Sequence, residues 1–188
     1  MSIYRIEKGC RSCGSSRLEN ILSFGETPLA DRLLTAEQLD TPEYKVPLTL
    51  VFCLECSLVQ IKETVDPEIL FFAEYPYFSS VSQSLMQHFL ESAVHIMDEK
   101  KLTGASLVVE AASNDGYMLK NFVERGIPVL GIDPAQAPVE VARKAGIPTL
   151  QTFFGKELAR KLKQDGKTAD VFLANNVLAH VQDLNGFV

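Results

Sequence analysis

Four cysteines constrain this 188-residue chain more than any other feature, because they occur as two Cys-x-x-Cys pairs. The pairs are Cys10 with Cys13 and Cys53 with Cys56. A two-residue spacer lets both thiolates of a pair face one ion, and Gly14 allows the backbone to turn tightly after the first pair. Two such pairs predict one closed, tetrahedral site for a structural zinc ion, with no open position for catalysis.

Redox-active or free thiols are the alternative interpretation of the two pairs. Neither pair lies in a thioredoxin-like strand–helix–strand context, and the N-terminus has no apolar stretch of the kind found in secretory signals. We therefore expect a cytoplasmic chain, in which thiols stay reduced and metal binding is favoured over disulfides. No segment approaches the ~20 apolar residues that span a bilayer. The net charge of -6 also argues against a nucleic-acid or membrane-surface partner.

The chain divides into three expected parts. Residues 1–62 hold both cysteine pairs, are rich in turn formers, and predict a small zinc-binding domain with two strands joined at the second pair. A short helix is expected at 35–39. Residues 63–104 predict a helical connector or lid that starts after the N-cap Asp66, is interrupted at Pro76 and stops at Gly104.

Residues 105–188 alternate short apolar runs with helical patterns. The expected strands are 106–113, 127–134, 147–154 and a fourth that starts at 169, with one helix between each pair. This alternation predicts right-handed βαβ units and a parallel sheet, so the fold class is α/β with a Rossmann-like domain. A doubly wound sheet has about two halves of three strands each. The sheet is therefore incomplete, and we expect a fragment of a longer protein.

Polar residues follow three of the expected strands. The first strand leads through Glu110 into a loop with a single glycine, Gly116, so the dinucleotide pattern G-x-G-x-x-G is absent and NAD or FAD is disfavoured. Asp133 ends the second strand, where an acidic side chain can accept hydrogen bonds from ribose hydroxyls. Asn175 and Asn176 follow the fourth. Parallel strands end at one edge of a sheet, so these groups predict one nucleoside site. Alternatively, the two acidic residues only form turns and cap helices.

The order of these motifs along the chain resembles a known family. The two cysteine pairs are followed by EYPYFSS at 74–80, VVEAASNDGYML at 108–119, GIDPA at 131–135 and NNVLAHV at 175–181. This order is similar to that of the S-adenosylmethionine-dependent sugar C-methyltransferases, which act on deoxysugars linked to thymidine diphosphate (TDP), and in particular to the deoxysugar C-3'-methyltransferases. The resemblance covers essentially the whole chain. It implies a zinc-binding N-terminal domain, a class I methyltransferase domain and a C-terminal sugar-nucleotide domain that this chain lacks.

The resemblance also implies roles for individual residues. S-adenosylmethionine contacts are expected from eight residues at the strand ends: Glu110, Ser113, Asn114, Gly116, Asp133, Pro134, Asn175 and Asn176. His180 is implied as an acid or base near the reacting carbon, and Tyr75 and Tyr77 as contacts to substrate or cofactor. The alternatives are a packed or helix-capping histidine and tyrosines that belong to the core. Ala111 departs from the family, in which a bulkier apolar residue is expected.

The implied reaction is C-methylation of a nucleotide-linked keto-deoxysugar. Such chemistry requires removal of a proton next to a carbonyl, and histidine can move a proton at neutral pH. The resulting enolate attacks the sulfonium methyl group of S-adenosylmethionine. Two other functions stay open on the sequence: a zinc-dependent interaction module joined to an inactive or incomplete cofactor-binding half-domain, and a methyltransferase with a different acceptor.

Overall fold

The computed structural model describes residues 3–71 and 75–188, which form two compact units. The first unit comprises Met1–Phe72 together with Ala179–Val188, and the second, which we call the sheet unit, comprises Ala73–Leu178. The expected connector at 63–104 is therefore divided between the two units. The last ten residues, which we expected to lie with the sheet, belong to the first unit.

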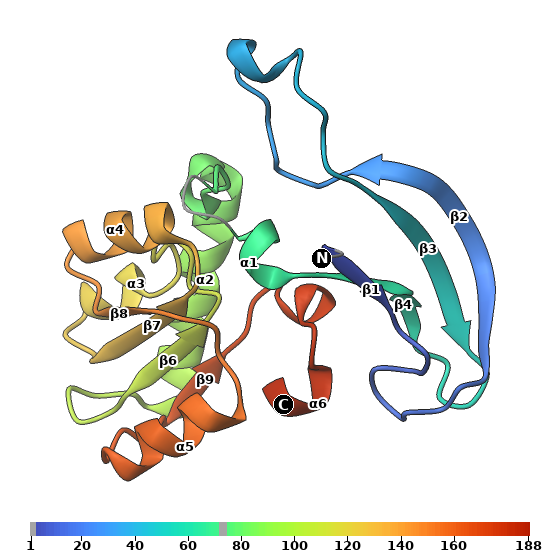
Figure 1. Cartoon of the computed structure of the whole chain (residues 1–188). Helices are drawn as coiled ribbons and strands as arrows, with labels where there is room; N and C mark the ends of the chain where they lie inside the picture. Colours follow the sequence, from blue (N-terminus) through green and yellow to red (C-terminus); the bar gives the residue numbers. More distant parts are fainter. Residues whose placement is uncertain (1–2, 72–74) are drawn as a thin grey trace. The chain divides into compact units, whose positions relative to one another are not determined.

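The first unit contains two small antiparallel sheets. Strands β2 (Leu18–Pro28), β3 (Lys45–Cys53) and β4 (Val59–Ile61) form one sheet in that order, and β1 (Tyr4–Ile6) pairs with β5 (Glu63–Val65) in the other. Figure 1 shows β2 and β3 as a long curved ribbon, with the short 3-10 helix η1 (Ala36–Gln38) in the loop between them. The predicted pair of strands on either side of the second cysteine pair is thus confirmed, as is the helical turn at 35–39.

Strand β5 corrects the prediction that residues 63–104 are helical. Residues 63–65 are extended because they pair with β1, with Thr64 opposite Arg5. That partner is far away in the sequence, so no local pattern indicates it. Helix α1 (Pro67–Leu70) begins where expected, since the Asp66 carboxylate accepts a hydrogen bond from the backbone N–H of Glu68 at 3.0 Å. Residues 72–74, which include Glu74, the first residue of the EYPYFSS motif, lie outside the described residues.

The sheet unit is built on four parallel strands in the order β8 (Thr149–Gln151), β7 (Val129–Asp133), β6 (Val108–Ala111) and β9 (Val171–Leu173). The chain steps outward from β6 to β7 and β8, and then returns to the far side of β6 to form β9. In open α/β sheets, ligands bind at the carboxyl ends of the strands on either side of such a reversal. The predicted parallel α/β sheet is confirmed, and the reversal lies between β6 and β9.

Helices cover both faces of this sheet. Helices α2 (Gln83–Lys100), α3 (Lys120–Val123) and α4 (Gln136–Lys144) pack on one face, where Phe89 and Phe122 contact the core residues around Val108. Helix α5 (Lys156–Gln164) covers the other face through Leu162, next to Val109. Figure 1 shows α4 and α5 on opposite sides of the strands. The sheet and its helices thus form the three layers expected of this fold class.

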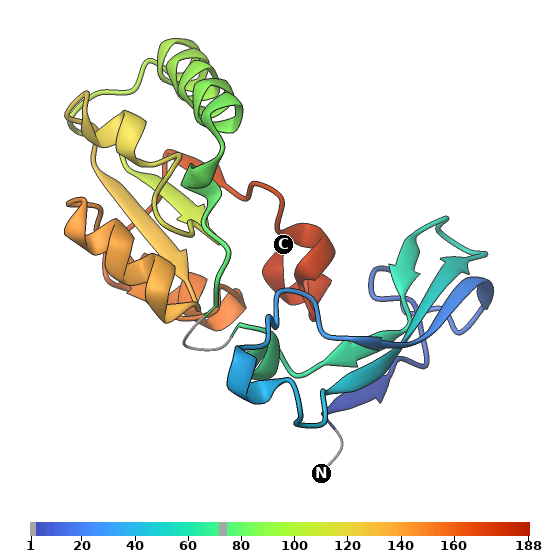
Figure 2. The same ribbon diagram turned by 90° about the horizontal axis from the view of Figure 1, so that it is seen from above.

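Helix α2 is the part of the predicted helical connector that follows the interruption at Pro76. It appears in Figure 2 as one continuous helix, buries Phe89, Ala93 and Met97, and ends at Lys101, which adopts a left-handed conformation with φ of 52°. It therefore stops before Gly104, where we expected its end. In the described part of the chain, no helix has both the length and the apolar character needed to cross a membrane.

Candidate functional site

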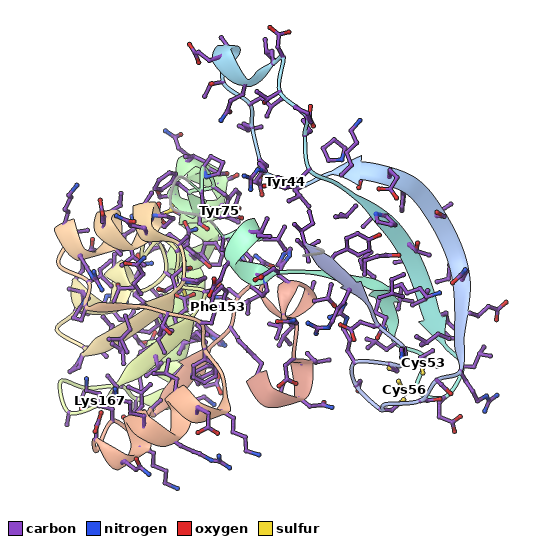
Figure 3. The ribbon with its side chains drawn as sticks, viewed as in Figure 1. Tyr44, Cys53, Cys56, Tyr75, Phe153 and Lys167 are labelled. Carbon is purple, nitrogen blue, oxygen red and sulfur yellow. The ribbon has the colours of Figure 1, made fainter. Side chains whose placement is uncertain are left out.

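The four cysteines come together in the first unit. Their Sγ atoms all lie within 4.8 Å of one another, with 3.5 Å between Cys10 and Cys56 and 3.6 Å between Cys13 and Cys53. A tetrahedral zinc ion with Zn–S bonds of about 2.3 Å requires sulfur–sulfur separations of about 3.8 Å. The donor set and its spacing therefore fit zinc. Figure 3 shows Cys53 and Cys56 with their sulfurs at the end of β3.

Strand pairing explains how two cysteine pairs so distant in sequence meet. The loop that carries Cys10 and Cys13 leads directly into β2, whose first residue Leu18 pairs with Cys53, the last residue of β3. The backbone N–H of Leu54 also donates to the carbonyl of Arg17 at 3.0 Å. The residues between the two pairs form the β2–β3 ribbon, whose paired strands bring the two cysteine pairs together. The long gap in sequence therefore does not disturb the geometry of the metal site.

The two cysteine knuckles have the same backbone conformation. The N–H of Gly14 donates to the carbonyl of Cys10, and the N–H of Ser57 donates to the carbonyl of Cys53, both at 2.9 Å. Gly14 and Ser57 both adopt positive φ, at 74° and 63°. Sequence reasoning identified the turn at Gly14 but missed Ser57, although aligning Cys-Arg-Ser-Cys-Gly with Cys-Leu-Glu-Cys-Ser reveals the equivalence.

Backbone N–H groups also favour the thiolate form at the second knuckle. The N–H groups of Cys56 and Glu55 lower the pKa of Cys53 to about 7 against the opposing effect of burial. Thiolates rather than thiols bind metal. The backbone of the second knuckle therefore favours the thiolate form of Cys53, the form that binds zinc.

Glu110 lies at the carboxyl end of β6, beside the reversal in strand order. Its carboxyl group is buried, and its Oε1 accepts a hydrogen bond at 2.9 Å from the side-chain amide of Asn175, which follows β9. Burial raises the pKa of Glu110 to about 8, while interactions with Asn175 and Tyr117 oppose that shift. Glu110 and Asn175 therefore meet across the switch point, as the strand-end argument predicted.

Asp133 ends the neighbouring strand β7 and is also buried. Its two carboxylate oxygens accept backbone hydrogen bonds from Ala135 and Asn114, both at 2.9 Å. Burial raises the pKa of Asp133, and these two N–H groups oppose the shift. Each carboxylate oxygen can accept a second bond, so the residue is oriented and retains acceptor capacity for a hydroxyl donor. Pro134 follows directly and is half-buried.

Gly131 allows the loop after β6 to pack against β7. It lies opposite Glu110 in the register, and a Cβ atom there would come within 2.6 Å of Ser113 Oγ and 2.9 Å of Thr149 Oγ1. Any larger residue would displace Ser113. Sequence analysis did not single out Gly131, because the contact depends on the pairing of three strands.

Asn114 and Asp115 hold the aromatic segment, which we define as residues 77–80. The Asn114 side chain accepts from the N–H of Ser79 at 2.9 Å and donates to the carbonyl of Tyr77 at 3.1 Å. Asp115 Oδ2 accepts from both the N–H and the hydroxyl of Ser80, at 3.3 and 2.5 Å. The expected cofactor loop therefore fixes the segment that carries one of the candidate tyrosines.

Gly116 is required for a reason other than the one expected. It adopts a φ of 81°, and a Cβ atom there would lie 2.3 Å from Cδ1 of Ile147, which is fully buried. The close approach is therefore to a core side chain. Whether Gly116 also contacts a cofactor stays a prediction.

The remaining predicted residues are more exposed. Asn176 is exposed with a φ of 50°, so its backbone forms the turn after β9. Tyr77 is 47% exposed, while Tyr75 is half-buried. His180 is exposed and belongs to the first unit. Their assigned roles stay predictions, whereas Glu110, Ser113, Asn114, Asp133 and Asn175 do gather at one end of the sheet.

Buried oxygens at this end of the sheet provide a test of fit for S-adenosylmethionine. Glu110 Oε2, Ser113 Oγ and Asp115 Oδ1 are buried and have no hydrogen-bond partner among the described residues. A buried polar atom without a hydrogen-bond partner costs about 1–3 kcal/mol, so such atoms indicate a missing partner. The ammonium group and ribose hydroxyls of S-adenosylmethionine are donors. The site therefore suits this nucleoside, and it has no glycine-rich cradle for a pyrophosphate.

The comparisons with known proteins agree with both halves of this description. Residues 10–71 match a family described as "putative zinc binding domain", and residues 109–188 match a methyltransferase domain. The first match contains all four cysteines, and the second contains the loop after β6 and the ends of β7 and β9. The chain thus carries a match to a zinc-binding domain and a match to a methyltransferase domain on a class I type of sheet, and the cofactors of these two domains are Zn²⁺ and S-adenosylmethionine.

Within this class the chain is similar to C-methyltransferase NovU of Streptomyces niveus. The two are 32% identical over 176 residues, which cover 94% of this chain and 42% of NovU. The chain thus spans less than half the length of this relative.

Proposed function

We propose that the whole protein transfers a methyl group from S-adenosylmethionine to a carbon atom of a TDP-linked keto-deoxysugar. The observation that carries the proposal is the convergence of Glu110, Asp133 and Asn175 at the carboxyl ends of neighbouring strands, beside buried oxygens that have no hydrogen-bond partner in the described part of the chain. The likeness to a C-methyltransferase supports carbon as the methyl acceptor. The nucleotide-linked sugar follows from the motif resemblance. A cytoplasmic location, without nucleic-acid or membrane partners, is part of the same proposal.

In this proposal the residues at the strand ends bind different parts of S-adenosylmethionine. Asp133 accepts a hydrogen bond from a ribose hydroxyl, because its carboxylate is fixed by two backbone N–H groups. Glu110 and Ser113 accept hydrogen bonds from the amino-acid part of the cofactor. Pro134 and Asn176 flank the nucleoside from the loops after β7 and β9. When bound, S-adenosylmethionine supplies an electrophilic methyl group.

Three residues act on the sugar in this proposal. His180 removes a proton from the carbon next to the ketone, which leaves an enolate able to attack the methyl group. Its exposure keeps it accessible to a substrate. Tyr75 and Tyr77 contact substrate or cofactor, and the hydrogen bond from Asn114 to the carbonyl of Tyr77 holds that part of the aromatic segment in place.

Calorimetric titration of the zinc-loaded chain with S-adenosylmethionine tests the cofactor half of the proposal. We expect saturable binding that Asp133→Asn weakens at least tenfold, because a charge-assisted hydrogen bond is worth roughly 1.5–3 kcal/mol. Asp170→Asn is the matched control. Asp170 accepts a backbone N–H from Leu107 at 2.7 Å, at the amino end of the sheet where no ligand is expected. Absence of saturable binding would instead favour the zinc-dependent interaction module with an inactive half-domain.

A further inference from the structure

The segment 179–188, which carries His180, is attached to the first cysteine knuckle. Arg11 Nη1 donates to the carbonyl of Gln182 at 3.1 Å, and the side-chain amide of Asn185 donates to the carbonyl of Ser12 at 2.9 Å. Arg11 and Ser12 are the two spacer residues between Cys10 and Cys13. Both spacer residues of the first knuckle therefore form hydrogen bonds with the segment.

Arg11 is itself held rigidly by the strands beneath the knuckle. Its Nη2 donates to the carbonyls of Ile61 and Glu63 at 3.2 and 3.1 Å, and to the hydroxyl of Thr64 at 2.6 Å. Its side chain is only 15% exposed. The two hydrogens of Nη2 are shared among these three acceptors, which fixes the direction of the planar guanidinium, so the Nη1 donor that faces Gln182 has little freedom to move.

The side chain of Gln182 supports the same attachment. With its oxygen oriented towards the neighbouring cation, the side-chain amide of Gln182 accepts a hydrogen bond from Arg5 Nη2 at 2.8 Å. Asp183 then accepts from the N–H of Gly186 at 3.0 Å and begins helix α6 (Leu184–Phe187). Both peptide and side chain of Gln182 are thus fixed to arginines of the first unit, two residues after His180.

We propose that Arg11 and Ser12 are positioning residues, through which the metal knuckle anchors the segment 179–188 and so fixes where His180 stands. The catalytic consequence depends on the proposed function of His180, whereas the anchoring itself does not. A zinc ion on Cys10 and Cys13 sets the turn between them, and that turn directs both the Arg11 side chain and the Ser12 carbonyl. A zinc ion held by these cysteines would therefore influence the reaction through the position of His180, without touching a substrate.

Hydrogen exchange measured by mass spectrometry on the zinc-loaded chain tests the anchoring. The amides of Gly186, Phe187 and Val188 are hydrogen-bonded within the segment, so their exchange reports its order. Arg11→Met should accelerate their exchange about tenfold, the effect expected from losing one charge-assisted hydrogen bond. Arg17→Met is the matched control. Arg17 is 64% exposed and pairs with Glu55, so its loss should leave the segment unchanged.

A second variant keeps the test decisive if Arg11→Met loosens the knuckle and releases zinc. Asn185→Ala removes only the bond to Ser12 and leaves every contact of Arg11 intact. It should accelerate exchange of the same amides about threefold at full zinc content, because a neutral hydrogen bond is worth less. Wild-type exchange in Asn185→Ala, and in any Arg11→Met protein that retains zinc, overturns the anchoring.

Kinetics of the full-length enzyme separate this inference from the proposed function. Arg11→Met should lower kcat and leave the KM for S-adenosylmethionine unchanged, since it displaces His180 and not the cofactor loop. If His180→Asn keeps full activity while Arg11→Met still accelerates exchange, the role of His180 is wrong and the anchor stands. If His180→Asn abolishes activity while Arg11→Met changes neither exchange nor kcat, the anchor is wrong.

Discussion

Single residues of the two knuckles differ in how well they suit the turn that both must make. Gly14 adopts its positive φ without steric cost, and Ser57 adopts the equivalent conformation with a Cβ atom present. A left-handed conformation costs a non-glycine residue about 1–2 kcal/mol. The second knuckle therefore stores strain that the first one avoids.

Substitutions at Ser57 and at Gly14 should change the stability of the first unit in opposite directions. Ser57→Gly should stabilise the zinc-loaded first unit by about 1 kcal/mol, because glycine removes the strain but adds entropy to the unfolded chain. Gly14→Ala should destabilise it by a similar amount. Its cost is conformational, since a Cβ there meets no atom within 4 Å. Urea unfolding of the zinc-loaded variants measures both changes. A destabilised Ser57→Gly protein would show that the serine side chain contributes more than its backbone costs.

The buried carboxyl of Glu110 makes the stability of the sheet unit depend on pH. Its pKa is about 8 in the folded chain and near 4.5 in the unfolded chain, so folding takes up a proton between these values. Stability should therefore fall as pH rises from about 4.5 to 8 and then level off. Glu110→Gln should remove most of this decline. At pH 8 its free energy of unfolding should therefore exceed that of the wild type by roughly a few kcal/mol. Hydrogen exchange of the β6 amides at pH 5.5 and 8 measures this change in stability. An equal dependence of stability on pH in both proteins would contradict the assignment of the pH effect to Glu110.

How far the site could be predicted depends on where each partner lies in the sequence. Glu110, Asp133 and Asn175 could be placed together because the carboxyl ends of parallel strands share one edge. Asn114 was assigned only to the cofactor, since its partners Tyr77 and Ser79 lie on a separate, irregular segment. No local pattern indicates that pairing. Nothing in the sequence indicated the role of Arg11, because a half-buried arginine with fixed partners cannot be told from a surface arginine by sequence alone.

At the scale of elements, the loop after β6 and the aromatic segment form one structural device. Removing the Asn114 side chain should loosen residues 77–80, and Asn114→Gly does so without creating strain at its φ of 50°. We expect faster exchange of the Ser79 amide and weaker S-adenosylmethionine binding. Asn121→Gly is the control, because Asn121 is a buried asparagine whose side-chain amide, among the residues that the structure describes, donates within its own turn of the chain, to the carbonyls of Tyr117 and Met118. Unchanged Ser79 exchange in Asn114→Gly would rule out the coupling.

Elements with strong local patterns were predicted well, and those that depend on distant pairing were not. The alternation of strands and helices beyond residue 105 was evident because apolar runs and helix-ending glycines recur in order. Strand β5 was mistaken for helix because its three residues are extended only through their pairing with β1. Helix α2 ends before Gly104, the expected end, because Lys101 itself adopts the left-handed conformation that closes the helix. Such outcomes are decided by tertiary contacts over local preference.

The whole molecule divides its stability unevenly between the two units. The sheet unit buries two apolar clusters, one on each face of its strands. Among the described residues of the first unit, the buried apolar side chains are Cys10, Leu29, Val46, Val51 and Cys53, of which two are cysteines of the metal site. A small unit with so little apolar core depends on its metal, because the free energy of metal binding becomes free energy of folding.

Removal of zinc should therefore act on one unit and spare the other. A strong chelator should unfold the first unit, so that amide exchange accelerates in β2, β3 and the segment 179–188. The sheet unit should keep its protection in β6 and β7, and its affinity for S-adenosylmethionine should change less than about threefold, because no buried residue of that core binds the metal. Titration with S-adenosylmethionine before and after chelation, with zinc re-addition as the control, measures this separation. Parallel loss of protection in both units would mean that they fold as one, and that the metal supports the cofactor site as well as the segment that carries His180.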